Sequence, residues 1–411
     1  MKKLYVFYPS LILGGAENLL LRSAKILSVF YDVTVIDKKS GWISSEIKRQ
    51  LITNINIIEL NFNSKITLEN DSILLTSANY LFQLDKYFNP SCSRLLLWSM
   101  HPNNLIPVVG RSKNVSLHNF NYAYFFSKIL SFNLLAKTKK FVAKANRLDA
   151  LFAMDGEVDA NLYQHYGVNH SGLIPVFVSS KDIISDKPVE VIRHSNSFHI
   201  LWLGRIDNDF KINILNYVLD KVETSKFAKE NKIIFHIVGD GPGFGQLQDK
   251  MASIKNFNFE KHGTLLGAQL EKVIDMCDIS FSMGMSALET AIRGCPTVLL
   301  DFSFTPINYD YNFKFIYESE NYIVGRDLGN KSASFKEKGK NMDSILSHVY
   351  NSYSQVANLS CNYVKEFHSE KEAEKLLLQG VASTKLTLID AVHFSFESRP
   401  YFRRLKHYFF K

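Results

Sequence analysis

The order of apolar segments along the chain is the strongest constraint on its fold. Short apolar runs alternate with helical stretches in the first half, and this spacing is typical of a parallel sheet covered on both faces. The predicted strands are Lys3–Tyr8, Tyr31–Asp37, Ile55–Leu60, Ser72–Ser77, Arg94–Ser99, Leu148–Met154 and Gly172–Val178. We therefore expect residues 1–178 to form an α/β domain with a doubly wound, Rossmann-like sheet.

The same alternation begins again after a polar segment. Residues 179–197 contain Pro188 and have no clear periodicity, which predicts a linker. The predicted strands beyond it are Phe198–Gly204, Ile233–Gly239, residues 256–263, Asp278–Ser282 and Pro296–Asp301. We expect a second doubly wound unit at residues 198–375 and a helical, basic and aromatic tail at residues 376–411. Two such units imply a central cleft, with ligands at the carboxyl ends of the strands.

Composition narrows the classes of partner. Of the 411 residues, 46% are hydrophobic and 21% are charged, so the whole chain can be globular. A net charge of +8 favours an anionic partner. Nucleic acid is disfavoured, because the basic residues are dispersed and no helix-turn-helix or zinc pattern occurs. The 4 cysteines form no CxxC pair, which argues against a disulfide framework or zinc site and predicts a reducing, cytoplasmic setting.

A glycine pair follows the first predicted strand. Gly14 and Gly15 precede a stretch in which apolar residues recur at helical spacing. Glycine lets another group approach the backbone closely, and a helix N-terminus favours negative charge. The pair therefore predicts either a phosphate-binding turn or an ordinary strand-to-helix turn.

A second turn carries two cations. Gly204, Arg205 and Lys211 follow the first strand of the second half, in the run GRIDNDFK. Arginine and lysine at a strand end can neutralise a diphosphate, although a solvated charge pair is the alternative. The same run holds Asp207 and Asp209 as a D-x-D pair, which can hold a divalent cation. Its place inside this loop favours a site without metal.

Two further turns complete the set. His262 and Gly263 end a predicted strand before a helix. Gly284, Met285 and Ser286 precede a short helix that carries Glu289, so free backbone amides and a carboxylate are expected at one helix start. Amides suit phosphate and a carboxylate suits ribose hydroxyls. The run VGDGPGFGQL does not satisfy G-x-G-x-x-G, so a dinucleotide fingerprint is not supported.

These features in this order resemble the GT-B glycosyltransferases of family 4, the retaining "group 1" enzymes. The resemblance covers residues 198–301 well and the N-terminal half more weakly. It implies two Rossmann-like domains, with the Gly14-Gly15 loop beside the donor diphosphate and the tail packed back on the N-terminal domain. It also implies that Glu289 holds the ribose, and that His101 lies near the donor sugar. A structural histidine before Pro102 is the alternative for His101.

The resemblance implies transfer of a sugar from a UDP- or GDP-linked donor, with retention of configuration and no cofactor. The acceptor would be a glycan or a polyprenyl-diphosphate-linked sugar. Charge on the leaving diphosphate would be met by Arg205, Lys211 and the amides around Met285 and Ser286. Two alternatives stay open: a sugar-nucleotide epimerase of the same fold, and a catalytically silent nucleotide-sugar-binding assembly protein.

One position departs from the family pattern. The family has two glutamates eight residues apart, of which Glu289 matches the second, and the position of the first holds Phe281. In the family this first glutamate touches the donor sugar. We expect Phe281 to alter the sugar pocket.

Two segments suggest a membrane surface. Residues 121–147 and 399–411 combine lysine or arginine with aromatic residues, a combination drawn to anionic lipid headgroups. A composition rich in Asn, Lys, Ile and Phe suggests an AT-rich bacterial genome. We expect a role in surface polysaccharide synthesis, with peripheral attachment to the inner face of the plasma membrane. The alternative is a domain helix with a solvated lysine face and a tail that packs on the protein.

Overall fold

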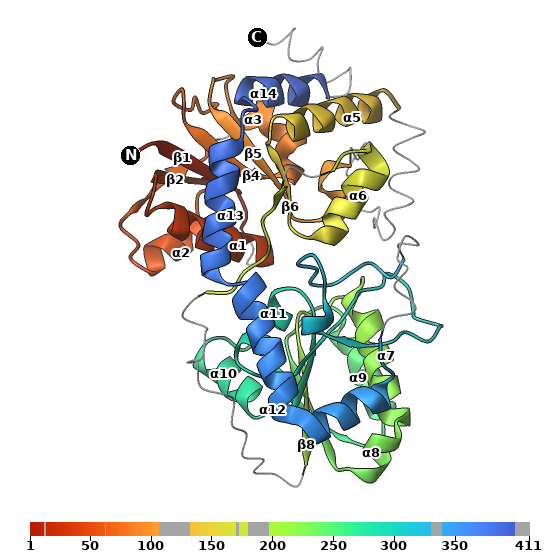
Figure 1. Ribbon diagram of the computed structural model, residues 1–411. Helices are drawn as coiled ribbons and strands as arrows, with labels where there is room; N and C mark the ends of the chain where they lie inside the picture. The colour runs from red at the N-terminus through yellow and green to blue at the C-terminus, as the bar shows by residue number, and fades with distance from the viewer. Residues whose placement is uncertain are drawn as a thin grey trace. The chain divides into compact units, whose positions relative to one another are not determined.

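The computed structural model describes residues 1–11, 14–61, 63–106, 132–169, 172–179, 197–329 and 339–398 (Figure 1). It divides into two compact units. Unit 1 comprises Met1–Val176 with Glu370–Lys411, and unit 2 comprises Phe177–Ser369. The sequence predicts the corresponding boundaries at residues 178 and 375. The linker expected at residues 179–197 lies almost wholly outside the described residues.

Unit 1 contains a parallel sheet with the strand order β3-β2-β1-β4-β5-β6-β7 among the described residues. Its strands are β1 (Lys3–Phe7), β2 (Asp32–Asp37), β3 (Ile55–Glu59), β4 (Ile73–Ser77), β5 (Arg94–Ser99), β6 (Leu151–Ala153) and β7 (Gly172–Leu173). Its helices up to residue 166 are α1 (Gly15–Leu27), α2 (Trp42–Arg49), η1 (Ala78–Gln83), α3 (Leu84–Tyr87), η2 (Pro102–Leu105), α5 (Phe132–Arg147) and α6 (Gly156–Tyr166). The buried strands account for the continuous apolar runs in the sequence.

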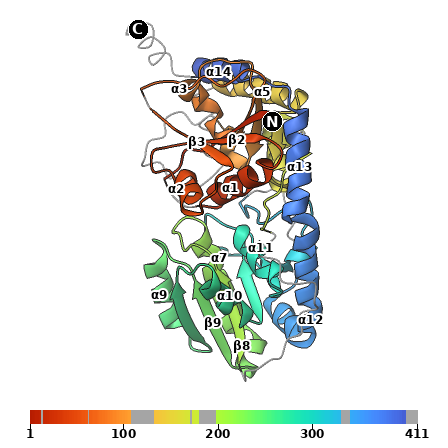
Figure 2. The ribbon, with the colours of Figure 1, turned by 90° about the vertical axis from the view of Figure 1, so that its left-hand side faces the viewer.

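The C-terminal helices α13 (Glu370–Ser383) and α14 (Leu388–Glu397) belong to unit 1. Both views show α13 beside α1, and α14 packs on α3 and η1 (Figures 1 and 2). Ser395 Oγ donates a hydrogen bond of 2.6 Å to Asp85 Oδ1, and the Phe394 ring stacks on Phe141 with centroids 4.4 Å apart. The described part of the predicted tail therefore packs on the N-terminal sheet layer, and residues 399–411 lie outside the described residues.

Helix α5 is the described half of the first basic and aromatic segment. Its Phe141 and Val142 are buried in the core of unit 1. Lys137 and Lys144 form ion pairs with Glu397 and Asp390 of α14, at 3.3 and 2.8 Å. This arrangement matches a domain helix with its lysines on the surface. Among the described residues, no helix is both long enough and apolar enough to cross a bilayer.

Unit 2 contains a sheet with the order β10-β9-β8-β11-β12-β13 among the described residues. Its strands are β8 (Phe198–Leu203), β9 (Ile233–Val238), β10 (Asn258–Gly263), β11 (Ile279–Ser282), β12 (Thr297–Leu299) and β13 (Lys314–Phe315). Its helices are α7 (Lys211–Thr224), α8 (Lys226–Glu230), α9 (Phe244–Ser253), α10 (Ala268–Asp275), α11 (Met285–Ile292), η4 (Ile316–Glu318) and α12 (Met342–Phe367). The pairs are parallel except β12–β13, which is antiparallel.

Alternate side chains of β8 point to opposite faces of this sheet. Ile200 and Trp202 join the large core that includes α7, whereas Leu201 and Leu203 join a smaller cluster that includes α10. Figure 1 shows α7, α8 and α9 on one side of β8 and α10 on the other. Both faces are thus covered, as the continuous apolar strands predict.

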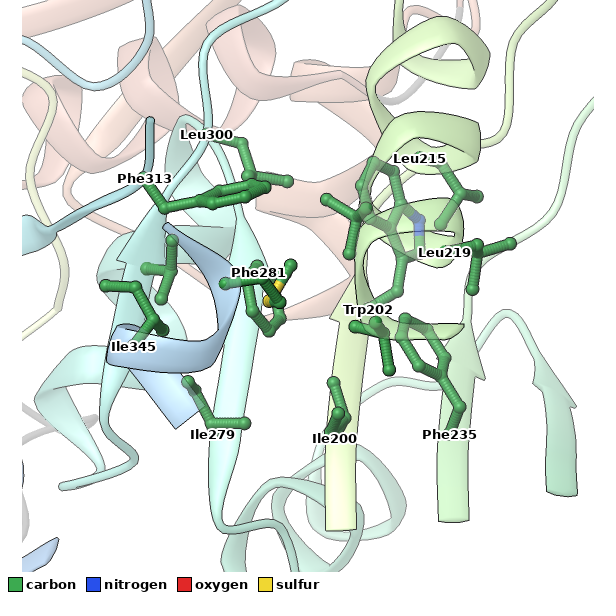
Figure 3. Packing of buried hydrophobic residues seen from close by; sticks show 14 of the residues in the cluster. Ile200, Trp202, Leu215, Leu219, Phe235, Ile279, Phe281, Leu300, Phe313 and Ile345 are labelled. Atoms are coloured by element: carbon green, nitrogen blue, oxygen red, sulfur yellow. The ribbon is translucent and has the colours of Figure 1, made fainter. Parts of the chain in front are cut away.

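Phe281 lies inside the large core of unit 2 (Figure 3). Its side chain is 0% exposed, its register partner on β8 is Trp202, and its ring meets Phe313 edge to face at 5.8 Å. The expectation that residue 281 contacts the donor sugar is therefore wrong. The reason is local: Met283 and Gly284 alone separate β11 from α11, so a position eight residues before Glu289 falls within the strand.

Candidate functional site

The candidate site lies at the carboxyl ends of β8 and β11. The strand order reverses between these two neighbours, because β9 and β10 extend the sheet on one side and β12 and β13 on the other. Ligands of open α/β sheets bind at such a switch point. Leu203 and Ser282 are register partners, so the turns that follow the two strands start side by side. These turns hold Gly204, Arg205 and Lys211 on one strand and Gly284 on the other.

The turn after β8 is organised around a buried carboxylate. Asp207 is 6% exposed, and its Oδ1 accepts hydrogen bonds from the backbone amides of Asp209, Phe210 and Lys211 at 3.2, 2.9 and 3.1 Å. It thereby satisfies amides at the start of α7. Its Oδ2 lies 3.5 Å from the guanidinium of Arg205, whose side chain is 65% exposed. Asp207 thus holds the shape of the turn and the start of α7.

This use of Asp207 bears on the D-x-D alternative. One of its oxygens already accepts three backbone amides, and the other faces a guanidinium. A divalent cation held by an aspartate pair needs free carboxylate oxygens. Asp207 contacts the backbone of the turn through Oδ1 and the Arg205 guanidinium through Oδ2.

Lys211 brings a second cation to the same turn. Its Nζ lies 3.5 Å from the place where a Cβ on Gly204 would stand, so the ammonium sits over the glycine. Burial, and then the charge of Arg205, lower the pKa of Lys211, while Asp207 opposes this shift. An anion bound between the two cations would relieve their repulsion.

The turn after β11 leaves a helix N-terminus open. Gly284 is the N-cap residue of α11, with φ of +61° and ψ of −139°, a conformation that side-chain-bearing residues rarely adopt. In the part of the chain that the structure describes, no side chain caps the start of α11, and its first turn has no acidic residue. The amides of Met285 and Ser286 lie in that turn, and Glu289 follows one turn along. Such a helix start suits an anion.

The two glycines of VGDGP serve to pack neighbouring turns. A Cβ on Gly239 would collide with the carbonyl of Gly204, and a Cβ on Gly241 would collide with the carbonyl of Ile206. The Ile206 amide donates to Asp240 O at 3.0 Å. These glycines let the turn after β9 lie directly against the turn after β8, which explains a glycine-rich motif that lacks the dinucleotide spacing.

The two site residues expected at the end of β10 lie in different surroundings. Gly263, with φ of +63°, lies at the carboxyl end, where its carbonyl accepts the Gly239 amide at 2.8 Å. The His262 ring turns toward β9 instead, with Nε2 3.0 Å from His236 Nδ1. His236 is not predicted from the sequence, because it lies on β9 and meets His262 and Glu260 only when β9 pairs with β10.

The expected site residues of unit 1 are a glycine pair beside a carboxylate and a histidine after β5. Gly14 is the N-cap residue of α1 and has extended backbone. Glu17 is 7% exposed, and its Oε2 would lie 2.6 Å from a Cβ on Gly14, so the carboxylate folds back over the helix start. Its negative charge therefore lies at the helix N-terminus, at Gly14 and Gly15, where negative charge is favoured. His101 follows β5, its carbonyl accepts the Asn104 amide at 3.0 Å, and burial lowers the pKa of its ring.

A buried ionic group beside β12 had no signal in the sequence. Asp301 is fully buried, with Oδ1 accepting from the Arg326 amide at 2.8 Å and Oδ2 from the Tyr311 hydroxyl at 3.2 Å. Burial raises the pKa of Asp301 to about 6, while the charge of Lys314 opposes this. Burial likewise lowers the pKa of Lys314 to about 8. These groups stabilise the loop after β12.

No family model and no curated protein sequence matches this chain. Solved structures do. One is HepE from Anabaena in complex with UDP and glucose, with a TM-score of 0.52 over 93% of this chain and 100% of the other, at 12% identity. A glycosyltransferase from Rickettsia africae gives 0.56 over 92% and 97%, at 12% identity. A mutant of S. aureus TarM, in complex with fondaparinux, α-GlcNAc-glycerol and UDP, gives 0.55 over 93% and 100%, at 12% identity.

Identity this low establishes the fold alone. The strand order of the sheet in each unit also agrees with a Rossmann-like domain. The fold predicted from the sequence is confirmed: the chain has the two-domain GT-B fold, with a Rossmann-like sheet in each unit.

Proposed function

We propose that this protein is a retaining glycosyltransferase that moves a sugar from a UDP- or GDP-linked donor to a glycan or polyprenyl-diphosphate-linked acceptor. One observation carries the proposal: two adjacent turns of unit 2 both suit a diphosphate. The first brings Arg205 and Lys211 together, and the second presents the uncapped start of α11. The HepE structure contains UDP and glucose, and the TarM structure contains UDP, which supports a nucleotide donor for this fold.

The chemistry follows from where charge develops. The bond between the anomeric carbon and the diphosphate oxygen breaks, and the acceptor oxygen bonds to that carbon on the same face. The acceptor proton passes to an oxygen of the leaving diphosphate. Arg205, Lys211 and the amides of Met285 and Ser286 stabilise the negative charge that grows on that group. Glu289 accepts hydrogen bonds from the ribose hydroxyls.

Further roles complete the proposed donor site. Within unit 2, the proposed donor-binding set comprises Gly204, His262, Gly263, Gly284, Met285, Ser286 and Glu289, and the proposed catalytic set comprises Arg205 and Lys211. Gly14 and Gly15 in donor binding and His101 in catalysis stay predictions from the family resemblance. His262 contributes through its backbone, since its ring is engaged with His236. The reaction uses no metal, in keeping with an Asp207 that caps α7.

The test begins with binding. Tag-free protein is heated with UDP, GDP and a panel of their sugars, and a true donor raises the melting temperature by mass action. Glu289→Gln should reduce that rise, whereas Glu230→Gln, an exposed glutamate on α8, should leave it unchanged. No rise with any nucleotide would contradict the proposed donor site.

Turnover then separates the alternatives. Transfer to an acceptor, or slow donor hydrolysis, in the presence of a chelator supports a metal-independent glycosyltransferase. Consumption of the donor to a second nucleotide sugar without acceptor would identify an epimerase. Nucleotide binding with neither reaction would identify a silent binding protein.

We further propose a bacterial role in surface polysaccharide synthesis, with peripheral attachment to anionic membrane. Residues 399–411 carry this part, because Lys137 and Lys144 of α5 form ion pairs with α14. Co-sedimentation with anionic vesicles should fall when residues 399–411 are deleted and when salt is raised, since charges are screened within about 10 Å at 0.1 M salt. Equal binding to neutral vesicles would contradict it.

A further inference from the structure

A row of histidines crosses one face of the unit 2 sheet. His199 on β8, His236 on β9 and His262 on β10 come from neighbouring strands. His199 Nδ1 lies 2.8 Å from His236 Nε2, and His236 Nδ1 lies 3.0 Å from His262 Nε2. The planes of adjacent rings differ by 20° and 14°. The middle ring is therefore held at both of its nitrogens.

A carboxylate joins one end of the row. Glu260 is the register partner of His236, and its Oε2 lies 3.4 Å from His236 Nδ1 and 4.0 Å from His262 Nε2. Ligand atoms of His236, Glu260 and His262 thus converge on one point, all within 4.8 Å of one another. Atoms separated by 3.0, 3.4 and 4.0 Å can all lie about 2.1 Å from a common centre, the length of zinc–nitrogen and zinc–oxygen bonds.

We propose that His236 Nδ1, His262 Nε2 and Glu260 Oε2 form a binding site for a transition metal of the Zn²⁺ class. Two imidazoles and one carboxylate suit Zn²⁺, Co²⁺, Ni²⁺ or Cu²⁺, whereas Mg²⁺ and Ca²⁺ require sites built from oxygen. Three protein ligands leave one position of a tetrahedron for water. The sequence predicts no metal, because His236 joins Glu260 and His262 only through the pairing of β9 with β10.

His199, the third histidine of the row, orients the ring of His236. When His236 Nε2–H donates to His199 Nδ1, the lone pair of His236 Nδ1 faces Glu260 and His262. Metal-bound histidines generally donate their other ring N–H to a hydrogen-bond acceptor, which sets the tautomer and the ring orientation. In the metal-free row His262 Nε2–H donates to His236 Nδ1. Binding moves that proton to His262 Nδ1, so neither ring changes its charge.

The position of the site indicates what the metal does. His236 is 0% exposed, but the side chains of His262 and Glu260 are 21% and 50% exposed, which gives an ion access from solvent. β10 ends the sheet on this side, and its pairing with β9 shifts register between Lys261 and Gly263. A bound metal would clamp this irregular edge strand to β9. The role is structural and does not rest on the proposed function.

The experiment uses full-length, tag-free protein that has been stripped of metal with a chelator. Equilibrium dialysis measures the stoichiometry for Zn²⁺ and Co²⁺, and the visible absorption of Co²⁺ reports tetrahedral coordination. Glu260→Gln and His262→Gln each remove one ligand from a partly exposed position, so both should fold. The matched controls are Glu230→Gln on α8 and His393→Gln on α14, both of which are exposed.

We expect one ion per chain, a higher melting temperature with metal, and Co²⁺ bands in the visible range. Each ligand variant should lose about tenfold or more in affinity, the scale of losing one part of a metal site, and the controls should not. Binding of less than one ion per chain, or binding by both ligand variants with the affinity of the unaltered protein, would overturn the site.

Discussion

The turn after β1 in unit 1 and the turn after β8 in unit 2 occupy the same place in two sheets of the same topology. Each follows the first strand of its unit, in the orders β3-β2-β1-β4 and β10-β9-β8-β11, and each leads into a helix. The side chains at the two helix starts differ. Glu17 folds over the start of α1, whereas Arg205 and Lys211 gather with Asp207 at the start of α7.

This difference shows that topology and chemistry are decided separately. The strand order creates a binding position at both switch points, because loops diverge there. The side chains then decide which position suits an anion. Neither α1 nor α11 has a side-chain hydrogen bond from its N-cap residue, but the first turn of α1 holds Glu17, whereas the first turn of α11 holds no acidic residue. We therefore expect unit 2 to be the half that binds an anion.

The largest expected effects on stability come from two corresponding strands, β11 in unit 2 and β4 in unit 1. They test whether both strands contribute to the hydrophobic core of their unit. Phe281 on β11 and Leu75 on β4 are fully buried. Phe281→Ala should lower the free energy of unfolding by about 3–5 kcal/mol, and Leu75→Ala by about 2–5 kcal/mol. Denaturant unfolding measures both. Phe281→Leu should leave donor preference unchanged, and a change in donor preference would return residue 281 to the sugar pocket.

The next effect concerns the cations of unit 2. Arg205→Ala and Lys211→Ala should each raise the barrier to transfer by about 2–4 kcal/mol, since each removes stabilisation of the leaving diphosphate. Initial rates at saturating donor measure this. Lys226→Ala, an exposed lysine on α8, is the control and should retain its rate. Unchanged rates in both site variants would remove the contrast between the two turns.

Glycine substitutions compare the two helix starts directly. Gly284→Ala should cost about 1–3 kcal/mol of stability, because alanine is strained at φ of +61° and ψ of −139°. Gly14→Ala should cost less, because the backbone there is extended and the flexible Glu17 side chain can move away. Thermal unfolding of the two variants in parallel would contradict this if Gly14→Ala were the more damaging change.

The smallest effect concerns the carboxylate of unit 1. Glu17→Gln should lower stability by about 0.3–1 kcal/mol, because it removes a negative charge from the N-terminus of α1. Affinity for a free nucleoside diphosphate, measured by calorimetry, should not fall. A large loss of affinity would mean that Glu17 supports the nucleotide itself, and the comparison of the two units would need revision.

Most of the strands, their parallel arrangement and the turns that carry the candidate site could be predicted from the sequence. These follow from local patterns: buried parallel strands read as continuous apolar runs, and strand-to-helix turns carry glycines and charges. Arg205, Lys211 and Gly284 were found in this way, and the structure brings their turns to neighbouring strand ends.

Features that depend on register and on long-range strand pairing could be seen only in the three-dimensional structure. Counting eight residues back from Glu289 placed Phe281 in a pocket, but the short turn after β11 places it in the core. The two-residue strand β13 was not predicted, because it is too short to show a period and forms by antiparallel pairing with β12. His199, His236 and Glu260 are far apart in the sequence and meet because β8, β9 and β10 pair side by side. Periodicity reports the environment of one segment, whereas contacts between segments are set by how the sheet is assembled.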